Sequence, residues 1–346
     1  MIMLNKLSLS DEEKRLIQTL LTEIVSKYRF WEDGEFLKDA AILAHDLPLR
    51  VRKFINDFKV LEPPSGICLI SGYPVDDSQI GRTPSHWKSK LESPHTLEIE
   101  TLLVLFGSLL GEAFGWVTQQ DGHIVHEVLP IKDYEDAQLG TSSSQTLWWH
   151  SEDAFHPYRG DYLGLMCLRN PDRVATTFAS IDMLELSTAQ IEILCQPRFI
   201  ILPDESHQER RSPQQKQPNG AGNSIESAYR RIKEMNTNPK RVPLLVGSRS
   251  SPYLCLDSVY MKTAGEDEEA DAALRALVQS VNENIQELIL QPGDYCFIDN
   301  YRTVHGRKSF QARYDGTDRW LKRINITRDL RKSRSARTTC ESRIIM

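Results

Sequence analysis

The chain has 346 residues, an apolar content of 40% and a charged content of 26%, which are typical of a globular protein with one large or two ordinary domains. The net charge of −6 argues against a nucleic-acid-binding protein, which usually carries a basic excess. The sequence also predicts neither a membrane span, because no apolar stretch approaches ~20 residues, nor a signal peptide at residues 1–10.

Helical and strand-like patterns follow one another in an order that predicts an α+β protein. Ser10 and Glu13 form the ends of a capping box, and apolar residues then recur at helical spacing up to Val25. Further helices are predicted at 36–44, 97–110 and about 268–289, and short strands at 67–70, 162–167, 198–202, 242–246, 253–256 and 295–298. Many short strands after N-terminal helices predict a single domain over residues 1–346, with a helical flank at about 8–60 and a double-sheet barrel at about 61–330.

Residues 205–240 interrupt this pattern, because Gln, Ser, Asn, Arg, Pro and Gly dominate and apolar periodicity is weak. A connection of this length inside a domain is usually a lid or a linker. Predicted strands flank the segment on both sides, which favours an inserted lid. Tyr229, Ile232 and Met235 give the segment apolar surface with which to dock.

The cysteines indicate a reducing compartment. None of the six stands in a CxxC pattern, and five lie among apolar neighbours, as Cys68 and Cys296 do. Such cysteines are typical of buried free thiols in a cytoplasmic protein. A cytoplasmic location also suits ferrous iron.

His150 and Glu152 form a His-x-Glu pattern that could bind a metal. Residues two apart on a strand point to one face, so both side chains are expected to reach the same ion. A second histidine, His305 in the run DNYRTVHGR (299–307), would complete a set of two imidazoles and one carboxylate. That set holds Fe(II) by one face and leaves positions open for a cosubstrate and O2. The same ligand types also bind zinc.

Two arginines follow His305 within the run RYDGTDRWLKR (313–323). If this run is a strand, Arg319, Leu321 and Arg323 share a face, and both guanidiniums project toward one cavity. Guanidinium is the side chain best suited to a bidentate grip on a carboxylate. Two such arginines beside a metal therefore predict a site for two carboxylates.

These segments resemble the clavaminate synthase-like branch of the Fe(II)/2-oxoglutarate oxygenases, and in particular its L-arginine β-hydroxylases. The similarity runs in the order of the family from about residue 35 to the C-terminus. The matching blocks are 116–122 (WVTQQDG), 150–159 (HSEDAFHPYR), 168–172 (LRNPD), 298–307 (IDNYRTVHGR) and 313–329. The resemblance implies a double-stranded β-helix (jelly-roll) core with flanking N-terminal helices and an inserted lid.

The resemblance also implies the cofactors. His150, Glu152 and His305 would hold Fe(II), and 2-oxoglutarate and O2 would be consumed as cosubstrates, with succinate and CO2 released. Arg319 would grip the far carboxylate of 2-oxoglutarate. Thr176 is a candidate hydroxyl partner for that carboxylate, although it could equally be a strand residue without a ligand.

By the same resemblance, Arg323 would bind the α-carboxylate of the substrate, and Gln119 and Glu152 would contact its α-amino group. A site that holds both groups selects a free amino acid. The implied reaction is hydroxylation at Cβ or Cγ of L-arginine or a close analogue, in the biosynthesis of an antibiotic or related peptide product.

The side-chain end of the pocket departs from the arginine hydroxylases, where an Asp-x-Asp pair meets the guanidinium. Here Asp257 matches the first acidic residue, but Val259 stands at the second. Asp204 matches another acidic residue near the guanidinium, and Gly140 replaces a serine. One carboxylate fewer removes about 1–3 kcal/mol of charge-assisted hydrogen bonding to a cation. Citrulline, lysine or a carboxamide such as asparagine therefore remain alternative substrates.

Other reactions remain open from the sequence. Desaturation differs from hydroxylation in that the same oxidant removes a second hydrogen atom instead of transferring its oxygen to the substrate. A zinc hydrolase and a binding module without activity belong to other classes. The absence of H-E-x-x-H argues against the first and the complete set of site residues against the second. Beyond a small-molecule substrate the sequence predicts no nucleic-acid or membrane partner, and it does not indicate the oligomeric state.

Overall fold

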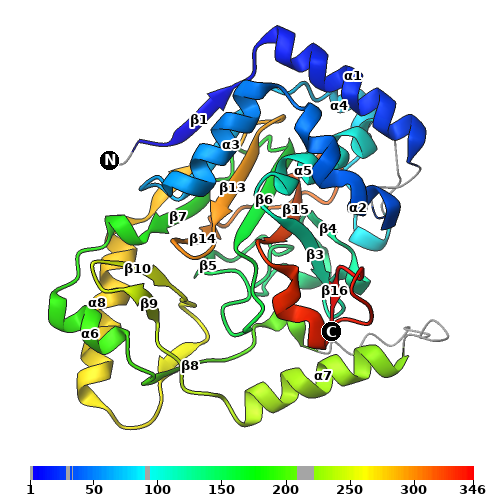
Figure 1. Cartoon of the computed structure of the whole chain (residues 1–346). Coiled ribbons are helices and arrows are strands. Elements are labelled where there is room, and N and C mark those ends of the chain that lie inside the picture. The colour runs from blue at the N-terminus through cyan, green and yellow to red at the C-terminus, as the bar shows by residue number, and fades with distance from the viewer. Residues whose placement is uncertain (1–2, 29–31, 33, 90–93, 209–221) are drawn as a thin grey trace.

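The computed structural model describes residues 3–28, 32, 34–89, 94–208 and 222–346 (Figure 1). The main helices are α1 (Asp11–Lys27), α2 (Gly34–Leu43), α3 (Leu49–Leu61), α4 (Asp77–Ile80), α5 (Pro94–Ser108), α6 (Thr188–Leu194), α7 (Gly222–Thr237) and α8 (Glu268–Asn284). None of the helices in these residues combines the length and apolarity needed to cross a bilayer. Cys68, Cys167 and Cys296 are buried free thiols, and Cys340 is exposed.

The strands of the described residues form two larger sheets and two hairpin-like pairs. The strands are β1 (Asn5–Ser8), β2 (Ile67–Ser71), β3 (Glu112–Trp116), β4 (Val125–Val128), β5 (Leu147–His150), β6 (Tyr162–Arg169), β7 (Thr176–Ser180), β8 (Phe199–Ile201), β9 (Leu245–Ser248), β10 (Ser251–Leu254), β11 (Met261–Thr263), β12 (Gln286–Leu288), β13 (Tyr295–Asp299), β14 (Thr303–Arg307), β15 (Trp320–Thr327) and β16 (Ile344–Ile345). The large sheet has the order β1-β2-β13-β6-β15-β3-β16, with β4 also paired to β15. The small sheet has the order β12-β7-β14-β5, while β9 pairs with β10 and β8 with β11.

The N-terminal helices and the small sheet cover the large sheet from opposite sides (Figure 1). On one side, Ile17 of α1 and Phe106 of α5 belong to the same core as Ile324 of β15. On the other side, Leu165 of the large sheet packs in a second core with Phe178 of the small sheet. Mixed helices and sheets in this arrangement agree with the predicted α+β class.

Local sequence signals account for the first helix but missed the third. Ser10 accepts a hydrogen bond from the Glu13 amide at 3.3 Å, and the Glu13 carboxylate accepts from the Ser10 amide at 2.8 Å, so the predicted capping box is confirmed. Helix α3 was not predicted. Its buried residues Val51, Ile55 and Phe58 stand at i, i+4 and i+7, the spacing that would have revealed it.

One further helix prediction needs correction. The helix expected at 268–289 ends at Asn284, because residues 286–288 form β12 and pair with β7. Within the segment predicted as a lid, residues 209–221 lie outside the described residues, and helix α7 occupies 222–237. Ile232 of α7 is buried, and Arg231 donates to the backbone oxygen of Met346 at 3.2 Å.

A buried charge cluster joins β15 to helix α5. Lys322 is fully buried, lies 2.6 Å from Glu100 Oε1 and also contacts Glu127 of β4. The Trp320 indole donates to Glu127 at 2.6 Å. Because side chains alternate along a strand, Lys322 points to the helical side of the sheet while its two neighbours line the cavity.

Lys322→Met is expected to lower the free energy of unfolding by about 3–5 kcal/mol, because it leaves two buried carboxylates without their shared ammonium. Urea unfolding would measure the loss. Lys308→Met, which removes an exposed ion pair with Glu287, should change stability by less than about 1 kcal/mol. A Lys322→Met variant as stable as the unchanged protein would contradict the prediction.

Candidate active site

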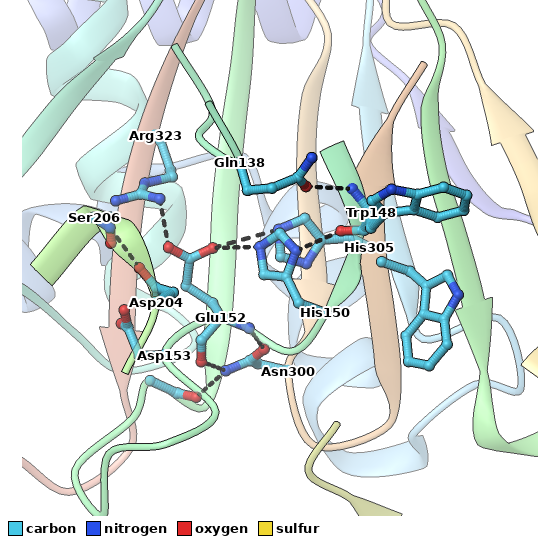
Figure 2. Close-up of polar contacts among 12 residues, drawn as sticks. Gln138, Trp148, His150, Glu152, Asp153, Asp204, Ser206, Asn300, His305 and Arg323 are labelled. Carbon is cyan, nitrogen blue, oxygen red and sulfur yellow. Dashed lines mark hydrogen bonds and ion pairs between the residues drawn. The ribbon is translucent and has the colours of Figure 1, made fainter. Parts of the chain in front are cut away.

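Three potential metal ligands meet where β5 pairs with β14. His150 ends β5 and is the direct antiparallel partner of His305 on β14, with ring centroids 4.6 Å apart. One carboxylate oxygen of Glu152 lies 3.7 Å from His150 Nε2 and 3.4 Å from His305 Nε2. Figure 2 shows the three side chains converging. Two imidazoles and one carboxylate around a common point form a facial set of the kind that holds iron.

Glu152 reaches this cluster by a different route from the one predicted. The strand ends at His150, so Glu152 lies in the following turn and the two residues do not share a strand face. Asn300 fixes the turn, because its side-chain oxygen accepts from the Glu152 amide at 2.7 Å and its nitrogen donates to the Glu152 carbonyl at 3.0 Å (Figure 2). His150 Nδ1 donates to the Trp148 carbonyl at 2.8 Å, which leaves Nε2 directed at the cluster.

The electrostatics keep Glu152 anionic. Burial alone would raise the pKa of this carboxyl, but Arg323, His150 and His305 hold the pKa well below its usual range. Although burial opposes it, the Glu152 carboxylate raises the pKa of His150 to about 9, whereas burial lowers the pKa of His305. An ionised carboxylate beside two imidazoles suits a divalent cation, whose binding would displace any proton from His150.

The cluster opens into a cavity of about 860 Å³ between the two sheets, a volume that includes some open solvent. Arg319, Leu321 and Arg323 all line it, so the predicted common face is confirmed. Arg319 is 5% exposed, and no hydrogen-bond acceptor or carboxylate contacts it within the described part of the chain. Burial lowers its pKa to about 10. Thr176, at the start of β7, is buried and lines the same cavity.

Arg307 also lines this end of the cavity and was missed by the sequence reasoning. Burial and the neighbouring Arg319 lower its pKa to about 9. Its guanidinium donates to Ser142 Oγ at 2.9 Å and to the carbonyls of Gln145 and Lys308 at 3.2 and 2.8 Å. Arg307 therefore connects the loop before β5 to β14. Its position two residues after His305 on the same predicted segment was the sequence signal that could have identified it as a site residue.

Arg323 lies on β15 beside the cluster. It forms an ion pair with Glu152 and donates to Gln119 Oε1 at 2.9 Å and to His126 Nδ1 at 2.6 Å. His126 Nε2 donates to the His123 carbonyl, so its Nδ1 is an acceptor, and burial together with Arg323 lowers the pKa of His126 well below its usual value. The Arg323 Nε–H has no acceptor among the described residues.

The opposite part of the cavity carries two carboxylates from separate loops. Asp257 Oδ1 accepts from the amides of Val259 and Tyr260, both at 2.9 Å, and Asp204 Oδ1 accepts from the Ser206 amide at 2.7 Å. Burial raises the pKa of Asp257, and Asp204 adds to this effect. Val259 also lines the cavity, but its side chain is 47% exposed. The backbone amides thus orient two acidic side chains before any ligand is present.

A second group of polar side chains lies on the side of Glu152 away from the histidines (Figure 2). Asp153, Asp204 and His207 bring potential ligand atoms within 4.8 Å of one another. Asp153 and His207 were not predicted as site residues. Asp153 directly follows the predicted ligand Glu152, and His207 comes three residues after the predicted Asp204. No pattern in the sequence indicates that Asp153 and His207 meet.

Known proteins resemble this chain over nearly its whole length. Residues 188–325 match the model of the taurine catabolism dioxygenase TauD, TfdA family. An L-ornithine/L-arginine 3-hydroxylase of Catenulispora acidiphila is 40% identical over 99% of this chain and 100% of that protein. An enduracididine β-hydroxylase of Streptomyces hygroscopicus is 43% identical over 98% of this chain and 99% of that protein.

A solved structure shares both fold and sequence. The non-heme iron oxygenase OrfP in complex with Fe, succinate and (3S)-hydroxy-L-Arg has a TM-score of 0.92 and 42% identity over 99% of both chains. The same oxygenase has been solved with Fe and α-ketoglutaric acid.

Proposed function

This chain belongs to the TauD/TfdA family of oxygenases, among relatives that hydroxylate amino acids, and we propose that it is an Fe(II)- and 2-oxoglutarate-dependent hydroxylase of a free L-amino acid. The proposed substrate is L-arginine or a close analogue, oxidised at Cβ or Cγ, in the biosynthesis of a natural product. The observation that carries the proposal is the facial set of His150, Glu152 and His305 in the same cavity as the unpaired, buried Arg319.

The residues present fit ferrous iron. His150 and His305 offer Nε2 and Glu152 offers a carboxylate oxygen, and together they would hold Fe(II) by one face. With 2-oxoglutarate and O2, bound iron supplies the oxidant for an unactivated C–H bond, which no amino-acid side chain can provide. Asn300 and the Trp148 carbonyl orient these ligands before the metal arrives.

The residues also fit 2-oxoglutarate. A guanidinium buried without an anionic partner is costly, and a dicarboxylate entering the cavity would supply the missing charge at Arg319. Thr176 is the candidate hydroxyl donor to the same carboxylate. Neither a zinc hydrolase nor a module without activity accounts for Arg319, and no observation favours either of them.

Arg323 is placed to bind the α-carboxylate of the substrate. Its Nε–H, which has no acceptor among the described residues, could donate to that carboxylate. Gln119 Oε1 and Glu152 lie on either side of the same guanidinium, which suits an α-ammonium group between them. Because Glu152 would contact both the α-amino group and the metal, Cβ and Cγ of a substrate held in this way would lie near the metal cluster.

Two carboxylates at the side-chain end favour a cation over a neutral substrate. The sequence suggested that Val259 leaves Asp257 with little support, but Asp204 faces the same cavity from another loop. Guanidinium and ammonium groups carry a positive charge that such a pair attracts in addition to accepting their hydrogen bonds, whereas the ureido group of citrulline is neutral. We therefore place L-arginine ahead of citrulline.

A substrate screen tests this order by substrate-dependent succinate formation and by a mass gain of one oxygen. Asp204→Asn and Asp257→Asn are each expected to lower the ratio of kcat/KM for arginine over citrulline about tenfold or more, the usual range for one charge-assisted hydrogen bond. Val259→Asp should raise the ratio. Asp57→Asn, on the distant helix α3, is the matched control, and an unchanged ratio in all three pocket variants would contradict this account.

Two further features are inferred. The large and small sheets that face each other across the cavity support a double-stranded β-helix core within one domain, 1–346. The free cysteines support a cytoplasmic enzyme, since disulfides are rare in reducing compartments.

A further inference from the structure

His207 has no role in the chemistry described above, yet its imidazole is buried beside the residues of the substrate pocket. Its side chain is 1% exposed and belongs to the turn of 3-10 helix at Glu205–His207. Nδ1 lies 2.7 Å from Thr118 Oγ1, and Nε2 lies 2.8 Å from Asp153 Oδ1. One imidazole thus joins three stretches of chain that are far apart in sequence.

The first of its partners, Asp153, follows Glu152 directly and has an unusual backbone conformation. Its φ is +52°, a region that residues other than glycine rarely adopt. The Asp153 side chain holds this conformation by two contacts, because Oδ2 accepts from the Trp116 indole at 2.6 Å and Oδ1 faces His207. Loss of His207 would remove one of the two close contacts of the Asp153 side chain, while Asn300 would still hold the backbone of Glu152 in the same turn.

The amide of Gln119 lies beside the Asp153 and His207 side chains. Arg323 Nη2 can only donate a hydrogen bond, so the atom of Gln119 that faces it at 2.9 Å must be the oxygen. The amide nitrogen then donates to Ser206 Oγ at 2.7 Å and lies 3.5 Å from Asp153 Oδ1, the oxygen that accepts from His207 Nε2. The residues after Asp204 therefore hold the Gln119 amide in one of its two possible orientations.

We infer that His207 is a positioning residue for the amino-acid head group. It holds Asp153 through Nε2 and Thr118, the neighbour of Gln119, through Nδ1, so that Gln119 Oε1 and the Glu152 carboxylate face the same point. This inference rests on the proposed function, since Gln119 and Glu152 are taken as the partners of the substrate α-amino group. His207 contacts neither His150, His305 nor Arg319, so the metal and cosubstrate sites should not depend on it.

His207→Leu removes the hydrogen bonds of the ring to Thr118 and Asp153, and His207→Gln retains an amide that can reach Asp153. The matched control is His156→Leu, which also removes a buried imidazole packed on Trp116, at 4.4 Å between ring centroids. The His156 ring accepts only the Tyr158 amide among the described residues and contacts neither Gln119 nor the Asp153 side chain.

The experiment measures three binding steps in the absence of oxygen: iron stoichiometry, 2-oxoglutarate binding by its visible charge-transfer absorption, and the change of that absorption on adding L-arginine. His207→Leu should weaken arginine binding about tenfold or more, the range for losing a hydrogen bond to a charged partner, and leave the first two steps within about twofold. In turnover it should yield more succinate per hydroxylated product. His207→Gln should recover part of the arginine affinity, and His156→Leu should bind arginine as the unchanged enzyme does.

Equal arginine affinity in His207→Leu and His156→Leu would overturn the inference. Loss of iron in His207→Leu would also overturn it, because His207 would then act on the metal. If the unchanged enzyme binds iron and 2-oxoglutarate but responds to no amino acid, the proposed function fails instead.

Discussion

His150→Ala and His305→Ala are each expected to abolish iron binding at stoichiometric concentration and to reduce hydroxylation more than about a hundredfold, since even residues that only orient metal ligands are worth about 10–100-fold. Each substitution leaves one imidazole and one carboxylate, too few to hold the ion by a face. Metal analysis after gel filtration and succinate formation would measure the two effects.

The fold should survive these substitutions. Both rings lie at the cavity wall, and neither belongs to the hydrophobic cores. His45→Ala, at an exposed histidine beside helix α2, controls for the loss of an imidazole as such. Retained turnover in either site variant would remove the metal assignment.

Arg319→Leu is expected to raise the 2-oxoglutarate concentration needed for half-maximal rate about 10–100-fold, in the range for a hydrogen-bonded charge pair. The same substitution should raise the free energy of unfolding of the ligand-free protein by about 1–3 kcal/mol, because it removes a buried cation that has no partner. Thermal unfolding with and without 2-oxoglutarate would show both effects, since a ligand stabilises only the protein that binds it.

Arg302→Leu should have the opposite effect on the free energy of unfolding. Arg302 is equally buried but pairs with Glu62 at 3.0 Å and with Asp182, so its removal should destabilise the protein. If Arg319→Leu also destabilised the ligand-free protein and left the 2-oxoglutarate requirement unchanged, Arg319 would be a structural residue.

The sequence predicted the composition of the site better than its geometry. Arg319, Leu321 and Arg323 could be assigned to one face because Leu321 and Arg323 alternate along β15 and Arg319 directly precedes it, although the pairing with β6 shifts register between Trp320 and Leu321. Glu152 could not be placed by the same rule, since β5 ends at His150. The turn that carries Glu152 depends on Asn300, which is 148 residues away in the chain.

The errors in the predicted secondary structure have similar causes. Residues 286–288 continue a helical pattern locally, and only their pairing with β7 makes them a strand. Long-range pairing of this kind is not encoded in a local period. The support of Gln119 by Ser206 and His207 was hidden for the same reason, because no spacing rule links residues almost ninety positions apart.

Strand β5 stands at the edge of the small sheet, and its ladder to β14 has a register shift between the pairs His305↔His150 and Arg307↔Leu147. An edge strand with so short a ladder is among the parts of a sheet that open most easily. An ion shared by His150 and His305 would brace this strand across the ladder. Iron supply would then govern the protein's resistance to degradation as well as its catalysis, so that cells short of iron would hold less of the enzyme.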